Sequence, residues 1–561
     1  MSPPDSDTVI AHILQRAAEA PAAVAFHFHD AQGGVEVISR EALIRRSLDW
    51  TRAYRRAGLK IGDIVIVLID HRPDLLFAYL GAMLGGFVPS YMPYSTAKQD
   101  RELYAQAHRK LFERIGARGV AVTREWLAEN QSIFEHGDFA LLLSDAVPQE
   151  VGSISEEPAS AGAAEDVVLL QHSSGTTSLK KGVALSNRAV LNQMRAYAPA
   201  ISVSPDDLIA SWLPLYHDMG LMTCWLLPLI RGVPVAQMDP FTWAREPWRL
   251  FEMIARYRAT LVWLPNFAYQ HLARMVDEEV RYDLSSVRAF IDCSEPCKPE
   301  TMRRFLERFA ADGVTAVQLQ ACYAMAENGF AVTQTPLSRP ARVLSADAAV
   351  LAQNHRFEPA GEGAERTIAF MSVGEPIAEV SVRVTDEQGL PLADGEVGEI
   401  AISGACLFSG YFHLPEETAL AMRGDWYHTG DLGFLWEGEL YVTGRLKDLI
   451  IVRGRNFYAH DIEQIVSGCA GVKPGRAVAF GVYNETLGSE EAVIVAEILD
   501  ADTLDPKASR ARSAEIKHAV EHELGLLPQT VRLVSSGWLV KTTSGKISRA
   551  ENARKYLAEK T

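Results

Sequence analysis

Helix-like and strand-like hydrophobic patterns alternate along the N-terminal part of the chain. Residues 40–58 carry apolar positions at helical spacing and end at a glycine, which predicts an amphipathic helix. Residues 64–69, IVIVLI, form a continuous apolar run that predicts a buried strand, and residues 74–84 predict the next helix. This alternation is typical of an α/β fold with a largely parallel sheet. Further strands are expected at 167–170, 261–264, 289–291 and 315–319, and further helices at 247–258 and 299–311.

The pattern changes after Gly374, where short strand-like runs alternate with turns. Gly389 and Gly438 lie between such runs and indicate hairpins, so this region is expected to form a β-barrel-like subdomain. Near residue 446 begins a unit with the usual size of a small domain. We therefore expect a large N-terminal domain of parallel and mixed sheets packed with helices (1–445), a hinge (446–449) and a small, mobile α+β C-terminal domain (450–561). The strands of these regions are expected at 380–385, 399–403, 426–428, 439–443, 477–482 and 492–498, and a helix at 513–524.

One apolar run, residues 75–92, carries no formal charge and approaches the length that a bilayer requires. Its glycines, Pro89 and Ser90 favour instead a buried helix that continues into a turn and a core strand. The net charge of -16 argues against nucleic acid as the main partner. The six cysteines contain no C-x-x-C pair, which argues against a zinc site or a disulfide framework. With no signal peptide visible, we expect a cytoplasmic protein that is not integral to a membrane.

Residues 172–186, HSSGTTSLKKGVALS, combine the residue types that bind phosphate. Glycine lets the backbone turn its N–H groups inward, hydroxyl groups donate to phosphate oxygens, and lysine adds positive charge. The loop is not the G-x-x-x-x-G-K-S/T sequence of P-loop NTPases. Taken alone, these residues also fit a flexible surface loop.

Three later motifs accompany this loop, and the set points to a family. They are WYHTGDL at 426–432, GRLKD at 444–448 and KTTSGKISR at 541–549. In this order the motifs resemble those of the adenylate-forming superfamily, and the resemblance runs from about residue 10 to the C-terminus. The stretches WLPLYHDMG (212–220), LPNFAY (264–269) and LKDLIIVRGRNFYAHDIE (446–463) resemble more narrowly the fatty acyl-AMP ligases, which pass acyl groups to acyl carrier proteins.

This resemblance implies ATP and Mg²⁺ as cofactors and assigns the catalytic residues. Lys546 is expected to bridge the substrate carboxylate and the α-phosphate, and His217 is expected beside that carboxylate. Glu327 and Thr176 are expected at the Mg²⁺ ion, because a carboxylate with phosphate oxygens and waters suits this ion. Lys447 is expected at the hinge, which lets one site form an adenylate and then admit a thiol.

The same resemblance assigns the binding residues. Asp431 and Arg445 are expected at the ribose, because a carboxylate accepts two hydrogen bonds from a diol, and Tyr323 is expected to stack on adenine. Trp212, Tyr216, Met219, Phe267 and Tyr269 are expected to line the acyl site, although each also fits a plain core position. The nucleotide site is expected to comprise Ser173, Ser174, Gly175, Thr176, Thr177, Lys181, Ser294, Glu295, Pro296, Cys322, Tyr323, Ala324, Met325, Asp431 and Arg445.

The sequence departs from the family pattern at three positions. Ala324 replaces a glycine next to the adenine position, Val540 replaces a proline before the C-terminal lysine motif, and Ala459 replaces another proline. Residues 337–373 form a long, irregular segment that fits either the insertion typical of fatty acyl-AMP ligases or a variable surface loop.

Three functions remain open at this point. The first is a fatty acyl-AMP ligase that loads a carrier protein supplied in trans, since no carrier-like G-x-D-S-L motif is visible in the chain. An acidic carrier would require a local basic patch, for which Arg453 and Arg455 are candidates. The second is a fatty acyl-CoA ligase with the same first half-reaction. The third is a nucleotide-binding scaffold without catalysis, for which Ala324 is the only support.

Overall fold

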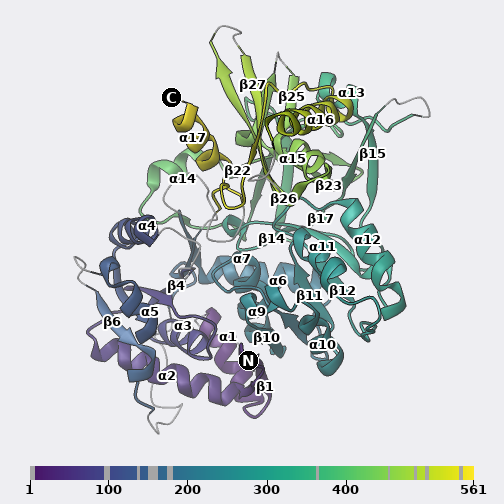
Figure 1. The fold of residues 1–561 in the computed structure, drawn as a ribbon. Coiled ribbons are helices and arrows are strands. Elements are labelled where there is room, and N and C mark those ends of the chain that lie inside the picture. The colour runs from purple at the N-terminus through teal and green to yellow at the C-terminus, as the bar shows by residue number, and fades with distance from the viewer. Residues whose placement is uncertain are drawn as a thin grey trace.

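The computed structural model describes residues 7–93, 101–134, 139–149, 162–172, 181–361, 366–452, 455–485, 489–499, 505–541 and 547–560. Helices and strands from the first part of the chain form the lower body in Figure 1, and the C-terminal elements lie above it. The mixed helix-and-sheet architecture confirms the predicted α/β class.

A nine-stranded sheet forms the centre of the lower body, in the order β17-β14-β13-β12-β11-β9-β10-β1-β2. Its inner strands run parallel, and β2, β14 and β17 are antiparallel to their neighbours. Strands β9, β10, β11 and β12 are buried along their length, as expected when helices cover both faces. The strands are β1 (Val24–His29), β2 (Val35–Ser39), β9 (Ile209–Ser211), β10 (Val235–Met238), β11 (Leu261–Leu264), β12 (Ala289–Asp292), β13 (Leu319–Ala324), β14 (Ala331–Gln334) and β17 (Glu375–Pro376). The helices of this region are α1 (Val9–Glu19), α6 (Asn187–Ala200), α7 (Asp218–Leu221), α8 (Leu227–Arg231), α9 (Pro240–Arg245), α10 (Trp248–Tyr257), α11 (Asn266–Met275) and α12 (Pro299–Phe309).

A second, parallel sheet of four strands has the order β4-β3-β5-β6 and a hydrophobic core of its own. The apolar run 75–92 forms α3 (Asp74–Leu84) and β4 (Val88–Tyr91), so the expected buried helix and core strand are confirmed. Among the described helices, none combines the length and apolar character that crossing a bilayer requires. The other elements are α2 (Arg40–Arg56), β3 (Ile64–Leu68), α4 (Arg101–Ile115), β5 (Ala117–Val122), α5 (Arg124–Glu129) and β6 (Ala140–Leu143).

Two smaller antiparallel sheets precede the C-terminal elements along the chain. One contains β7, β8 and β20, and the other contains β18, β19, β21, β22 and β23. Gly389 and Gly438 have positive φ angles of 81° and 82° in the turns β18–β19 and β22–β23, as the hairpin prediction requires. The bounds are β7 (Val167–His172), β8 (Gly182–Ser186), β18 (Val380–Thr385), β19 (Gly398–Gly404), β20 (Gly410–Tyr411), α14 (Pro415–Ala421), β21 (Met422–Arg423), β22 (Trp426–Trp436) and β23 (Glu439–Arg445).

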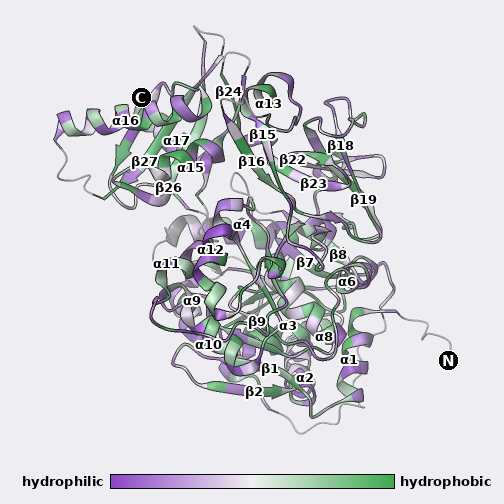
Figure 2. Cartoon of the chain, turned by 90° about the vertical axis from the view of Figure 1, so that its right-hand side faces the viewer, coloured by the Kyte–Doolittle hydropathy of each residue, from purple (hydrophilic) through white to green (hydrophobic). Residues whose placement is uncertain are grey.

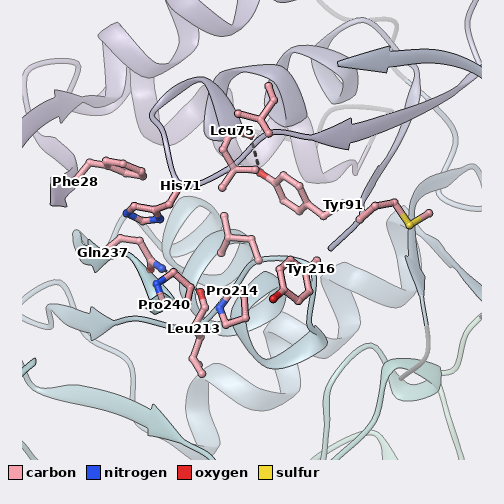
Figure 3. A pocket seen from close by; sticks show the side chains of 12 residues that line it. Phe28, His71, Leu75, Tyr91, Leu213, Pro214, Tyr216, Gln237 and Pro240 are labelled. Atoms are coloured by element: carbon pink, nitrogen blue, oxygen red, sulfur yellow. Dashed lines mark hydrogen bonds between the residues drawn. The ribbon is translucent and has the colours of Figure 1, made fainter. Parts of the chain in front are cut away.

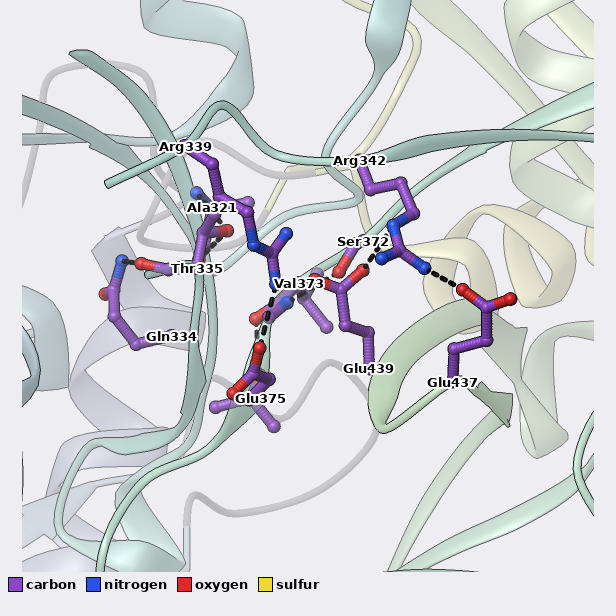
Figure 4. Close-up of polar contacts among 12 residues, drawn as sticks. Ala321, Gln334, Thr335, Arg339, Arg342, Ser372, Val373, Glu375, Glu437 and Glu439 are labelled. Carbon is purple, nitrogen blue, oxygen red and sulfur yellow. Dashed lines mark hydrogen bonds and ion pairs between the residues drawn. The ribbon is translucent and has the colours of Figure 1, made fainter. Parts of the chain in front are cut away.

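Residues 337–373 are more regular than the sequence indicates. They contain β15 (Val343–Asp347), α13 (Ala348–Asn354) and β16 (Thr367–Met371), and β15 pairs with β16. Ion pairs connect this segment to β23, because Arg339 and Arg342 both pair with the buried carboxylate of Glu439 (Figure 4). Arg339 also lies 2.8 Å from Glu375, at the start of β17. Long-range ionic partners, which the local pattern does not reveal, thus order this segment.

The C-terminal elements surround a three-stranded sheet, β26-β27-β28, with separate hydrophobic clusters on its two sides. Helices α15 and α16 pack on one face, and α17 packs on the other. In Figure 2 these elements form a lobe beside the one that contains β18, β19, β22 and β23. The bounds are β24 (Leu449–Val452), β25 (Arg455–Tyr458), α15 (Ala459–Gly468), β26 (Val472–Asn484), β27 (Ser489–Ile498), α16 (Pro506–Leu524), β28 (Thr530–Val534) and α17 (Arg549–Lys560).

Candidate active site

Glu327 follows the central strand β13, in the short 3-10 turn Ala326–Asn328. Its Oε1 accepts a hydrogen bond of 2.9 Å from the Tyr411 hydroxyl, which also lies 3.1 Å from the Tyr427 hydroxyl. Burial raises the pKa of Glu327, whereas the Tyr411 hydrogen bond lowers it. The carboxylate is therefore held in one position but is costly to keep charged without a nearby cation.

Lys181 lies on the other side of the same tyrosine, just before β8. Its ammonium is 4.5 Å from the centroid of the Tyr411 ring and 2.6 Å from Glu417 Oε2 on α14. The Lys181 charge holds the pKa of Glu417 below its usual range. Tyr411 thus separates a cation on its face from the Glu327 carboxylate at its hydroxyl.

The hairpin β7–β8 frames the expected phosphate loop. His172, the last residue of β7, pairs with Gly182, the first residue of β8. The connecting residues Ser173, Ser174, Gly175, Thr176 and Thr177 lie outside the described part of the chain, as does Lys546. Of the residues expected in the phosphate loop, Lys181 is therefore the one that the structure describes. It lies directly before the first residue of β8.

Tyr323, Asp431 and Arg445 are joined by polar contacts. The Tyr323 hydroxyl donates to Asp431 Oδ2 at 2.6 Å, and Arg445 Nε lies 2.9 Å from Asp431 Oδ1. Asp431 and Arg445 are direct partners in the register of β22 and β23. Three residues that are distant in sequence therefore meet because β13 ends beside this hairpin.

The turn before Asp431 is held by Glu399. This carboxylate accepts from the Gly430 N–H at 3.1 Å and lies 2.8 Å from His428 Nδ1. Gly430 has a φ of 71°, which favours glycine, and the Asp431 N–H donates to the Thr429 hydroxyl at 3.0 Å. The conformation of the T-G-D motif is thus fixed by contacts that leave the Asp431 side chain directed toward Tyr323.

Ser294, Glu295 and Pro296 follow β12, beside the N-terminus of α11. Ser294 adopts a positive φ of 67°, and Pro296 is exposed. Glu295 Oε2 accepts from the Phe267 N–H at 3.1 Å. A carboxylate at a helix N-terminus is favourable, because the helix dipole is positive there.

The strand β13 carries Cys322 and Tyr323, which are buried, and Ala324, which is half-buried. The following Met325 donates its N–H to Phe330 O at 2.8 Å. Ala324 pairs with Ala331 of β14 and is not among the residues with a positive φ. Its methyl group therefore imposes no backbone strain at the position where the family pattern has glycine.

The apolar residues expected around the acyl group lie in different surroundings. Trp212 stacks on Trp243 with ring centroids 3.7 Å apart, and Phe267, which is 48% exposed, meets both rings edge-on. Met219 is buried with its sulfur 3.1 Å from Cys293 Sγ. Tyr269 is fully buried against Phe305, as a core residue would be.

His217 and Tyr216 precede α7. His217 is half-exposed, its ring tilts against Tyr216 at 4.9 Å, and its carbonyl accepts from the Leu221 N–H at 2.8 Å. The Tyr216 carbonyl accepts from Gln171 Nε2 at 3.0 Å, which ties this loop to the end of β7. Of the five residues expected at the acyl group, Tyr216 alone is among those that line the cavity in Figure 3.

Lys447 is exposed in the 3-10 turn Leu446–Asp448 between β23 and β24. Its neighbour Asp448 lies 2.6 Å from Arg549 at the start of α17, and Arg549 also pairs with Glu463 at 2.7 Å. The turn is thus coupled to the segment that follows Lys546.

Sequence reasoning did not identify Tyr411, Glu417 or Tyr427 as site residues. Tyr427 lies inside the WYHTGDL motif, so its position was visible. Tyr411 follows Gly410 in the aromatic stretch FSGYF, which is a weaker signal. Glu417 carries no local signal, because its relevance comes from a contact with a residue more than 200 positions earlier.

Comparison with known proteins identifies the family. A family model described as AMP-binding enzyme matches residues 13–412. A medium-chain-fatty-acid–acyl-carrier-protein ligase of Moorena producens (strain JHB) is 32% identical over 431 residues, which cover 74% of this chain and 72% of that protein. A Mycobacterium tuberculosis protein with a provisional name as a fatty-acid–CoA ligase is 28% identical over 93% of this chain and 92% of its own length. A solved structure, from work on fatty acyl-adenylate ligases of E. coli and L. pneumophila, has a TM-score of 0.88 at 26% identity, covering 98% of this chain and 97% of that one. The chain belongs to the AMP-binding enzyme family.

Proposed function

We propose that this protein is a cytoplasmic enzyme that activates a fatty acid as acyl-AMP and transfers the acyl group to the phosphopantetheine thiol of a separate acyl carrier protein. The observation that carries the first step is the pair of polar groupings around β13. Tyr323, Asp431 and Arg445 form one, and Lys181, Tyr411 and Glu327 form the other. The carrier-protein ligase of Moorena producens and the fatty acyl-adenylate ligase structure support the choice of substrate and acceptor.

In this proposal the first grouping binds the nucleoside. Asp431 accepts hydrogen bonds from the ribose hydroxyls with the lone pairs that Tyr323 and Arg445 leave available. The Tyr323 ring, whose tilt is fixed by its bond to Asp431, stacks on adenine. Residues 294–296 and 322–325 line the adenine side.

The second grouping serves the phosphates. Lys181 and the loop residues 173–177 hold the β- and γ-phosphates, and Lys546 bridges the acyl carboxylate and the α-phosphate. Glu327, with Thr176, suits Mg²⁺, because a half-buried carboxylate whose pKa is raised by burial gains most from a nearby cation. Bound there, Mg²⁺ neutralises charge on the phosphate oxygens.

The chemistry then proceeds in two steps. A carboxylate oxygen of the acid attacks the α-phosphorus, the bond to the β-phosphate oxygen breaks, and pyrophosphate leaves. The carrier thiolate next attacks the acyl carbonyl carbon, AMP departs with the bridging oxygen, and the thiol proton passes to solvent. His217 stands beside the acid in the first step as a positioning group.

We propose the domain division 1–445, 446–449 and 450–561, with Lys447 in the hinge. The second step requires the thiol to reach a site that Lys546 occupied in the first, so the C-terminal unit must move. The separate hydrophobic clusters of the C-terminal sheet support a unit that keeps its own core during such motion.

A fatty acyl-CoA ligase is the second candidate, supported by the provisional name of the Mycobacterium tuberculosis relative. The purified protein is incubated with Mg-ATP and a mixture of C6 to C18 acids in three reactions. One reaction contains CoA, one contains a phosphopantetheinylated carrier protein, and one contains neither acceptor. The products are identified by mass spectrometry. Acyl-AMP that persists with CoA but disappears with the carrier supports carrier loading. Acyl-CoA formation overturns the proposed acceptor, and a lack of adenylate with every acid overturns the activity itself.

A further inference from the structure

A small cavity lies between the two sheets of the N-terminal body. Its wall contains hydrogen-bond acceptors, which an unsubstituted hydrocarbon chain cannot satisfy. It is bounded on one side by Leu75 of α3 and Tyr91 at the end of β4, and on the other by Leu213, Tyr216 and Gln237 (Figure 3). Its volume is about 20 Å³, which is the space of one water molecule or one hydroxyl group.

Gln237 places a hydrogen-bond acceptor in this wall. It lies in β10, between β9 and β1, and is 3% exposed. Its Nε2 donates to Leu213 O at 3.0 Å, which fixes the orientation of the amide, because the reversed amide would set two oxygens together. No protein group that the structure describes donates to the buried Oε1. A buried amide oxygen without a donor is unfavourable.

His71 provides a second acceptor in the same cavity. Its Nε2 lies 3.0 Å from His29 O, so this nitrogen carries the hydrogen, and the ring stacks on Phe28 at 4.2 Å. Burial lowers the pKa of His71, so the ring is neutral and Nδ1 is left as an acceptor. The Tyr91 hydroxyl donates to Leu75 O at 2.9 Å and is thereby directed away from these two atoms.

The cavity adjoins the proposed acyl site. Leu213 and Tyr216 belong to the loop that ends in His217, and the Tyr216 carbonyl is hydrogen-bonded to Gln171 at the end of β7. The remaining wall is apolar, with Phe28, Ile69, Leu75, Met92 and Leu215 among its residues. Two acceptors in an apolar wall select a group that donates one hydrogen bond and is otherwise hydrocarbon.

We propose that the acyl substrate of this enzyme carries a hydroxyl group, and that the hydroxyl occupies this cavity and donates a hydrogen bond to Gln237 Oε1 or His71 Nδ1. This inference rests on the proposed function and narrows its substrate class. A saturated chain would leave the buried Gln237 Oε1 without a donor from the described residues. A site built around a substrate hydroxyl discriminates strongly against the analogue that lacks it.

The test compares dodecanoic acid with a series of its monohydroxy isomers. The kcat/KM of adenylation is measured for each acid, and the Kd of each acid is measured by equilibrium dialysis without ATP. Gln237→Met removes the acceptor and keeps the side-chain length. Gln193→Met is the matched control, because Gln193 is also fully buried, donates to a backbone oxygen (Ala331 O, 3.0 Å) and keeps an Oε1 without a described donor, but is not among the cavity residues.

We expect the wild-type kcat/KM to be at least about tenfold higher for one hydroxy isomer than for dodecanoic acid. In Gln237→Met this ratio should fall close to one through loss of activity on the hydroxy acid, and Gln193→Met should retain it. If no hydroxy isomer is preferred by the wild-type enzyme, the cavity holds only a bound water and the inference is overturned. A preference that persists in Gln237→Met overturns it as well.

The binding measurement separates this inference from the proposed function. If adenylates form without preference, the function stands and the inference fails. If no acid is adenylated but a hydroxy isomer binds at least about tenfold more tightly than dodecanoic acid, and only when Gln237 is present, the inference stands and the function fails.

Discussion

The Tyr411 hydroxyl donates a hydrogen bond of 2.9 Å to Glu327, across the junction of the sheet containing β20 and the end of β13. A second hydrogen bond joins the same two segments, since the Phe408 N–H donates to Glu327 O at 2.8 Å. Tyr411 therefore controls both the position of this carboxylate and its affinity for a proton.

Replacing Tyr411 by phenylalanine should change the pH dependence of the reaction. Burial already raises the pKa of Glu327, and the Tyr411 hydroxyl opposes this by stabilising the charged form. Without the hydroxyl the pKa of Glu327 rises further. On acidification Glu327 is therefore protonated at a higher pH than in the wild-type enzyme. The acidic limb of the kcat/KM profile for Mg-ATP should move to higher pH, and high Mg²⁺ should partly reverse the shift. Tyr441→Phe is the control, because the Tyr441 hydroxyl donates at 3.1 Å to a different carboxylate, that of Glu439, which Figure 4 shows. An equal shift in this variant would contradict the role of Tyr411.

Asp431→Asn should weaken nucleotide binding more than it weakens folding. The change removes the charge that Arg445 and Tyr323 contact, and hydrogen bonds to charged groups contribute about 1.5–3 kcal/mol. The KM for ATP should therefore rise roughly tenfold to a hundredfold. Asp145→Asn breaks an exposed contact with Arg124 (2.9 Å) and should leave the KM unchanged. An unchanged KM in Asp431→Asn would remove Asp431 from the ribose site.

Glu417→Gln should release Lys181 for the phosphates. The pair is partly exposed, so its loss should change the free energy of unfolding by less than about 1 kcal/mol. Because Glu417 competes with phosphate for the same ammonium, the KM for Mg-ATP should fall a few-fold and the pyrophosphate-exchange rate should become more dependent on salt. A rise in the KM would mean that Glu417 positions Lys181 instead of competing with the substrate.

Lys546→Ala should abolish the first half-reaction while ATP still binds. A lysine that bridges two anions acts mainly in the transition state, so adenylation should fall at least about a hundredfold. Pyrophosphate exchange reports the chemical step, and nucleotide binding by equilibrium dialysis reports the site. Lys507→Ala, at an exposed lysine near the start of α16, should leave both unchanged. Normal exchange in Lys546→Ala would contradict the proposed role.

The fold class and most buried strands were predictable because burial on both faces leaves continuous apolar runs. IVIVLI became β3, and the run 75–92 became α3 and β4. The expected strand at 315–319 was wrong. Residues Ala316–Gln318 form a 3-10 turn, because Gln318 caps Thr315 and also binds Val287 O, and β13 begins at Leu319. The strand therefore carries Tyr323 itself, which the apolar pattern alone did not indicate.

Some residues of the candidate site could be predicted from the sequence, and others could not. Residues inside contiguous motifs, such as Asp431, could be named from their neighbours in sequence. Glu417 acts through a contact across the fold, and no pattern of spacing reveals such a contact. Gln237 lies between these two cases. The sequence shows a single amide within the apolar strand VAQM, but a role for this amide can be inferred only from the cavity that it lines.

The pairing of β1 with β10 has a consequence for synthesis of the chain. Phe26 pairs with Val235, so the first strand of the central sheet lacks its parallel neighbour until about 200 further residues have left the ribosome. At ordinary elongation rates this delay is roughly 10 to 40 seconds. During that time the apolar residues of β1 and α1 must be shielded by local collapse or by a chaperone. We therefore expect the yield of folded enzyme in cells to depend on chaperone capacity more than on the stability of the finished protein.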